Sequence, residues 1–142
     1  MKKLLWCILI TLSFSTWAVQ KNGCVVMNSS VETALRQALA DDVGLDPDEL
    51  DLKQSRLALL DNVLITDQLA KQYAREDVVE MKYIDYMEMY NLYKSNHARN
   101  LIIKYTYFNK QGKKNVYIGS ALVDDSECSL GFKGYLTVSR EF

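Results

Sequence analysis

His97 is the only histidine of the chain, and histidine is the side chain best suited to acid–base chemistry near neutral pH. It lies in a polar segment, residues 94–99, where the sequence pairs it with no nucleophile or acid. An ordinary solvated loop histidine is therefore the favoured interpretation. A small hydrolase that uses His97 as a general base is the least favoured alternative.

Asp124, Asp125 and Glu127 form an acidic group close to Cys128. Paired carboxylates suit acid–base work, but Asp and Ser are also typical of exposed turns, and the turn is favoured here. The sequence contains no glycine-rich phosphate loop, no HExxH zinc motif and no GxSxG nucleophile motif. We therefore expect no catalytic site, no metal and no cofactor.

The first residues have the three-part pattern of a secretory signal peptide. Lys2 and Lys3 precede an apolar run, Leu4–Phe14, and small residues lead to a cleavage site after Ala18. The run is about a dozen residues long, whereas a membrane-spanning helix needs about 20. We expect a cleaved signal peptide at 1–18 and one domain at 19–142, exported to a periplasm or secreted. An uncleaved anchor and a buried first helix are the alternatives.

Two cysteines, Cys24 and Cys128, remain once the leader and its Cys7 are removed. An even number of cysteines in an exported chain predicts a disulfide. The bond would close a loop of roughly 105 residues, which the chain-entropy model values at about 4.7 kcal/mol. Free thiols, a metal-binding pair and a cysteine nucleophile assisted by His97 are the other possibilities.

The charge of the mature chain excludes some classes of partner. Loss of Lys2 and Lys3 leaves 15 of the 17 Lys and Arg against 18 Asp and Glu, a net charge of −3. A mildly acidic chain without a basic run argues against nucleic acid. The sequence has no basic amphipathic helix for a membrane surface and no second apolar stretch that predicts a transmembrane segment.

The clearest predicted element is an amphipathic helix over residues 30–43. Ser29 and Glu32 form a capping box, and apolar residues recur after them at helical spacing. Gly44 is a natural helix stop. The other helices predicted in the first half are a short turn at 47–54 capped by Asp46 and a helix at 67–75 capped by Thr66.

The hydrophobic pattern of two segments fits both a helix and a strand. Residues 56–65 match both a strand and a helix, and a strand is favoured. In residues 78–93 a helix is favoured for 83–93, because Tyr and Met side chains fall in one stripe, and the part before it stays open.

The last third alternates in hydrophobicity as strands do, over residues 100–108, 115–123 and 134–142. A polar hairpin loop joins the first two, and a loop with Cys128 precedes the third. The predicted fold class is α+β: N-terminal helices packed on a small antiparallel meander of three to four strands, with one disulfide. This layout is similar to that of cystatin-like and nuclear-transport-factor-like folds, without a shared motif, so it implies no function.

Two features suggest a surface for another protein. Asp41 and Asp42 lie at the negative end of the first helix, where acidic residues are unfavourable. A tolerated surface defect is the favoured interpretation, and an acidic patch for a basic partner is the alternative. Tyrosines gather between residues 73 and 107, and Tyr suits both cores and interfaces. The candidate partner-binding tyrosines are Tyr83, Tyr86, Tyr90 and Tyr93.

These patterns predict a small exported binding protein of the bacterial envelope, an inhibitor or immunity-type protein that acts by protein–protein contact. The alternative is a secreted or periplasmic accessory factor for assembly or virulence.

Overall fold

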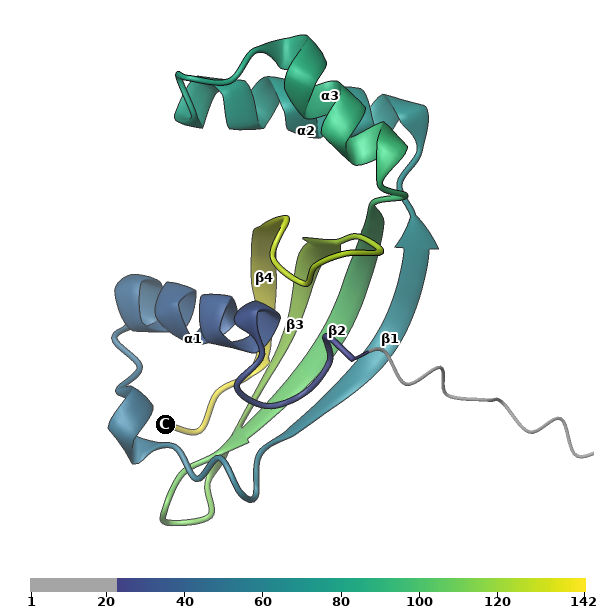
Figure 1. Cartoon of the computed structure of the whole chain (residues 1–142). Coiled ribbons are helices and arrows are strands. Elements are labelled where there is room, and N and C mark those ends of the chain that lie inside the picture. The colour runs from purple at the N-terminus through teal and green to yellow at the C-terminus, as the bar shows by residue number, and fades with distance from the viewer. Residues whose placement is uncertain (1–22) are drawn as a thin grey trace, which may run out of the picture.

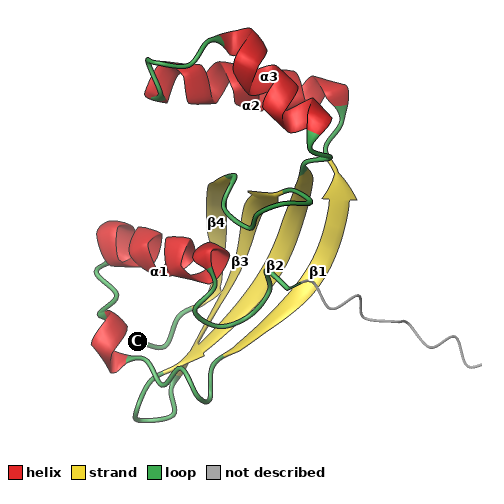
Figure 2. Cartoon of the chain, in the orientation of Figure 1, coloured by secondary structure: helices red, strands yellow, loops and turns green. Residues whose placement is uncertain are grey.

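The computed structural model describes residues 23–142, which form an open, C-shaped arrangement of helices around one curved sheet (Figures 1 and 2). The predicted signal peptide, its cleavage site and Cys7 lie outside the described residues. Between residues 23 and 142 there is no helix with the length and apolar character needed to cross a bilayer. The elements in chain order are α1 (Ser30–Val43), the short 3-10 helix η1 (Pro47–Glu49), β1 (Arg56–Leu64), α2 (Asp67–Glu80), α3 (Tyr86–Ser95), β2 (Arg99–Phe108), β3 (Lys114–Val123) and β4 (Gly131–Ser139).

The sheet is an antiparallel meander with the strand order β1-β2-β3-β4, which confirms the predicted α+β class. The segment 56–65, which fitted both templates, contains strand β1. Tyr105 pairs with Tyr117 near the middle of the sheet, so their rings reach the same face. The α2–α3 hairpin is inserted between β1 and β2 and lies beyond the end of these strands (Figure 1).

Helix α1 forms over the predicted residues because its two ends are capped as the sequence indicates. The Ser29 side chain accepts a hydrogen bond from the Glu32 amide, and Gly44 ends the helix in the left-handed conformation, with φ of 66°. One face of the helix buries Leu35 and Leu39. They pack against the sheet residues Leu101, Ile103, Tyr105, Tyr107 and Tyr117.

Glu32 does more than cap the helix, because its carboxylate is fully buried beneath α1. It accepts hydrogen bonds from the Tyr107 hydroxyl at 2.9 Å and from the Asn28 amide at 3.1 Å. The Arg36 guanidinium lies 2.7 Å from the same carboxylate. A buried charge is tolerated only when it is paired and hydrogen-bonded, and this one is both.

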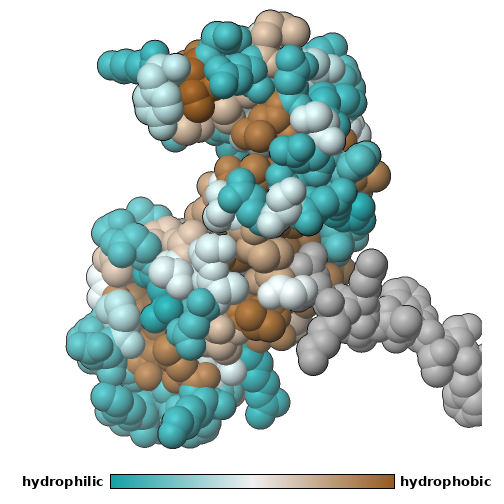
Figure 3. Space-filling view, in the orientation of Figure 1, coloured by the Kyte–Doolittle hydropathy of each residue, from teal (hydrophilic) through white to brown (hydrophobic). Residues whose placement is uncertain are grey.

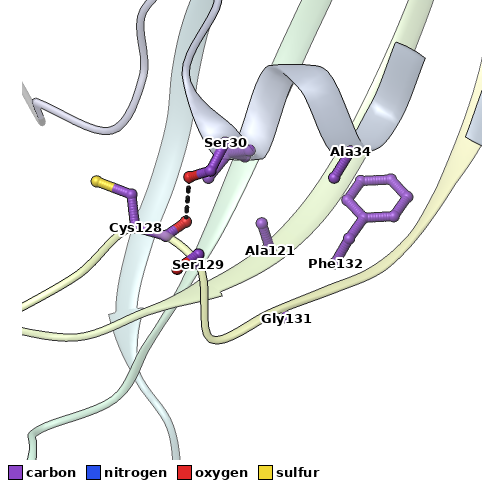
Figure 4. A pocket seen from close by; sticks show the side chains of 8 residues that line it. Ser30, Ala34, Ala121, Cys128, Ser129, Gly131 and Phe132 are labelled. Atoms are coloured by element: carbon purple, nitrogen blue, oxygen red, sulfur yellow. Dashed lines mark hydrogen bonds between the residues drawn. The ribbon is translucent and has the colours of Figure 1, made fainter. Parts of the chain in front are cut away.

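The predicted disulfide between Cys24 and Cys128 is present, with 5.4 Å between the two Cα atoms. It joins the N-terminal arm to the loop between β3 and β4. The hydroxyl of Ser30 donates to the Cys128 carbonyl at 3.0 Å and fastens the same loop to the first turn of α1 (Figure 4).

Several boundaries differ from the prediction for local physical reasons. The helix expected at 83–93 begins at Tyr86, because Asp85 caps it and accepts from the Glu88 amide at 3.0 Å. Residues 78–80 belong to α2, which is longer than predicted. The turn expected at 47–54 is helical only at Pro47–Glu49, and the last strand is Gly131–Ser139 because Phe132 already pairs with Ala121.

Removal of the disulfide tests how much it contributes. We expect the double variant Cys24→Ala with Cys128→Ala to lose about 2–4 kcal/mol of unfolding free energy, since the bond closes a loop across a sequence separation of 104. Urea denaturation would measure the loss. A reductant should lower the midpoint of the wild-type protein and leave that of the double variant unchanged. Equal stability of the two proteins would contradict this role.

Candidate interaction surface

The free end of the α2–α3 hairpin exposes three large apolar side chains close together in the chain. Val79 is in the last turn of α2, Tyr83 in the connecting turn and Met87 in the first turn of α3, with 75%, 82% and 55% of their surfaces exposed. We call this set the hairpin tip. Tyr and Met are typical of protein–protein interfaces. Figure 3 shows apolar surface near this end of the hairpin.

The local structure holds the hairpin tip in place. Met81 and Ile84, the neighbours of Tyr83, are partly buried in the apolar cluster between α2 and α3. The Ile84 amide donates to the Met81 carbonyl at 3.1 Å, which closes the turn. Tyr83 therefore points away from a turn whose other apolar residues face inward.

Acidic side chains flank the hairpin tip in the sequence. Glu76 and Glu80 are exposed on α2, and Asp85 and Glu88 are exposed at the start of α3. The nearby exposed cations are Arg75 and Lys82, so acids outnumber bases here. An apolar centre with an acidic rim is complementary to an apolar depression with a basic rim.

A buried ion pair fixes the hairpin to the sheet. Lys133, at the start of β4, lies 2.8 Å from the Asp77 carboxylate of α2, and little of either side chain is exposed. The other oxygen of Asp77 accepts a short hydrogen bond from the Tyr93 hydroxyl of α3. The Lys133 ammonium also lies 4.7 Å from the centre of the Tyr73 ring. One lysine thus contacts both the α2 carboxylate and an aromatic ring of the same helix.

This cluster is arranged for attachment and not for proton transfer. Burial, with the hydrogen bond to Asp77, raises the pKa of Tyr93 far above its ordinary value, so the phenol stays protonated and donates. A tyrosine poised for acid–base catalysis would need a pKa closer to neutral. The three side chains hold the hairpin at a fixed position over the sheet.

A hollow lies between the hairpin and the rest of the molecule (Figure 3). A cavity of about 420 Å³ is lined there by the α2 residues Glu76, Asp77 and Glu80 and by the segment from Leu130 to Lys133. A smaller cavity of about 90 Å³ adjoins it where α1 meets β4. Phe132 and Ala34 lie at one end of that cavity and Cys128 and Ser129 at the other (Figure 4).

The structure places the four candidate tyrosines differently. Tyr83 belongs to the hairpin tip, and Tyr86 is half-buried beside Arg75 and Val78. Tyr90 stacks on Tyr86 with ring centres 6.2 Å apart. Tyr93 is only 1% exposed, so it anchors the hairpin and does not reach a partner's surface.

Tyr90 is also held in place by a hydrogen bond within the same molecule. Its hydroxyl donates to Asp67 at 2.6 Å, which raises the pKa of Tyr90. A hydrogen bond from Lys71, followed by the one from Tyr90, lowers the pKa of Asp67 to about 2. Asp67 therefore stays ionised and fastens the start of α2 to α3.

The two candidate aspartates lie on a different element, at the end of α1. The side chain of Asp41 accepts from Gln37 at 3.0 Å, and that of Asp42 accepts from the Tyr135 hydroxyl at 3.1 Å. Both remain exposed. In the view of Figure 1 this end of α1 and the free end of the hairpin lie on the same side, below and above the hollow.

The residues considered for chemistry occupy exposed loops. The His97 ring lies 3.1 Å from Asp125, and 69% of each side chain is exposed. Asp124 accepts from the amides of Ser126 and Glu127, as expected of a turn. Among residues 23–142, no group of three or more His, Cys, Asp and Glu side chains is placed to hold a metal ion.

The sequence singled out neither Asp77 nor Lys133, and it did not identify Val79 as a surface residue. Asp77 and Lys133 are far apart in the chain and gave no local signal. Tyr83 and Met87 were expected in the helical stripe of residues 83–93, and the segment that contains Val79 was left open between helix and strand. Because a turn follows α2, these residues lie at the exposed end of the hairpin and not on a packed helix face.

Comparison of the chain with models of known protein families, with characterised proteins and with solved structures gave no match.

The ion pair predicts how the hairpin responds to mutation. Lys133→Ala leaves the Asp77 carboxylate buried without its cation, so we expect about 3 kcal/mol less unfolding free energy and faster amide exchange in α2 and α3 than in the sheet. Hydrogen-exchange mass spectrometry would measure the difference. Lys71→Ala, which breaks the exposed pair with Asp67, is the control and should leave the stability nearly unchanged. Uniform exchange across the molecule would show that the pair does not attach the hairpin.

Proposed function

We propose that this chain is an exported protein of the bacterial envelope that binds another protein through the hairpin tip, as an inhibitor or immunity-type protein does. The observation that carries the proposal is the exposure of Val79, Tyr83 and Met87 on a hairpin that a buried ion pair holds in place. A rigid, exposed aromatic side chain loses little entropy on binding, so it suits an interface centre.

The partner we propose is basic. The acidic rim of the hairpin tip and the exposed Asp41 and Asp42 of α1 both favour a positively charged surface. Export is supported by the N-terminal pattern of the sequence, and a disulfide fits an oxidising compartment. The alternative, an accessory factor that acts in the envelope or outside it, would use the same surface on a different target.

The experiment begins with affinity capture from the periplasm and the medium, using the chain with its own leader and a C-terminal tag. A captured protein is then purified and its binding measured by calorimetry. We expect Tyr83→Ser with Met87→Ser to weaken binding at least tenfold without loss of stability, because the apolar centre is removed. Val26→Ser is the control, since Val26 is an apolar residue that is 44% exposed but lies on the N-terminal arm. Full binding by the hairpin variant would refute the role of the hairpin tip.

The two aspartates at the end of α1 give a separate test. Asp41→Asn with Asp42→Asn should weaken binding severalfold at low salt, and the difference from wild type should shrink as salt screens both proteins. Binding that is insensitive to salt and to this pair of changes would exclude the basic partner while leaving the hairpin tip in place.

A further inference from the structure

The face of the sheet opposite α1 has a band of apolar side chains across its middle. Across the strands, Ala58, Lys104, Ile118 and Leu136 form one row, in which Lys104 is the only charge. Val63 on β1 and Val138 on β4 add further apolar surface, and about half of each side chain is exposed. Polar side chains border the band, with Arg56 and Thr106 on one side and Asn100 on the other.

The face is also hollowed. The next row consists of Asp61, Ile102, Ser120 and Gly134. Since Gly134 has no side chain and Ser120 a short one, a depression of about 420 Å³ opens between Ile102, Ile118 and Leu136. Its size and lining suit a protruding apolar side chain from another surface.

The charges on the two rows are complementary to each other. Lys104 and Asp61 are both exposed, and neither takes part in an ion pair within the described part of the chain. Consider a two-fold axis in the plane between two stacked sheets, midway between these two rows and running across the strands. Rotation about this axis places the Lys104 row of one copy over the Asp61 row of the other. Each lysine then comes within one strand spacing of an aspartate, twice in a symmetric pair.

The end row of this face is covered, because Leu122 is fully buried in the cluster of α2 and α3. The three remaining rows, four strands wide, measure about 19 by 20 Å. That is about 800 Å² in total for two copies, the size of a weak, reversible interface.

We infer that this chain forms a two-fold symmetric homodimer by stacking the open faces of two sheets, with Lys104 of each copy paired with Asp61 of the other. The dimer leaves the hairpin tip of each copy outside the interface, so the inference stands apart from the proposed function. Stacked sheets with apolar inner faces are a common way to complete a core.

Sedimentation equilibrium of the disulfide-bonded protein between about 1 and 200 µM tests the inference. We expect a monomer–dimer equilibrium whose dissociation constant rises at least a hundredfold in Leu136→Lys. Lys104→Asp and Asp61→Lys should each weaken the dimer about tenfold, and the variant with both changes should recover to within about threefold of wild type. Tyr83→Ser is the control and should leave the equilibrium unchanged.

The charge exchange keeps the test decisive where one substitution disturbs the fold, because recovery of the dimer without a matching recovery of the unfolding free energy indicates pairing between copies. Urea denaturation of each variant accompanies the sedimentation. A monomer at every concentration would overturn the inference, as would a dimer that Leu136→Lys does not weaken or single charge changes that the double variant does not reverse.

Discussion

The structure depends on the packing of a single helix, α1, against one face of a four-stranded sheet. Helix α1 buries Leu35 and Leu39 against one face, and the buried Glu32 carboxylate bonds to Tyr107 on the sheet beneath it. A sheet has two faces, and a single helix covers only one. The middle of the opposite face is left open with a band of apolar side chains, and at its end Leu122 is buried in the cluster of α2 and α3.

The hairpin packs around a second apolar cluster, in which Tyr93 and Met89 are buried together with Leu122 of β3. Its position over the sheet rests on a few contacts, of which the Asp77–Lys133 ion pair is the most directional. A buried pair of this kind costs desolvation energy and fixes one geometry in return. The exposed hairpin tip can present a constant surface to a partner because its base is fixed.

The disulfide and the hairpin attachment meet in the same segment of the chain. Cys128 is bonded to the N-terminal arm, and Lys133, five residues later, is bonded to α2. The segment from Cys128 to Lys133 is therefore linked both to the N-terminal arm and to α2. Residues 130–133 of this segment line the hollow between the hairpin and the rest of the molecule. In this arrangement a single disulfide fastens the loop before β4 to the N-terminal arm.

The sequence by itself determined α1, since the capping box and Gly44 are local signals that tertiary packing did not override. It also determined the meander and the Cys24–Cys128 bond, through alternation in the last third and the even number of cysteines. Only the tertiary structure decided that Tyr93 is buried while Tyr83 is exposed, because both fit one helical stripe until Asp85 begins a new helix. The Asp77–Lys133 pair and the open apolar face were likewise beyond the sequence, since each depends on which distant segments become neighbours.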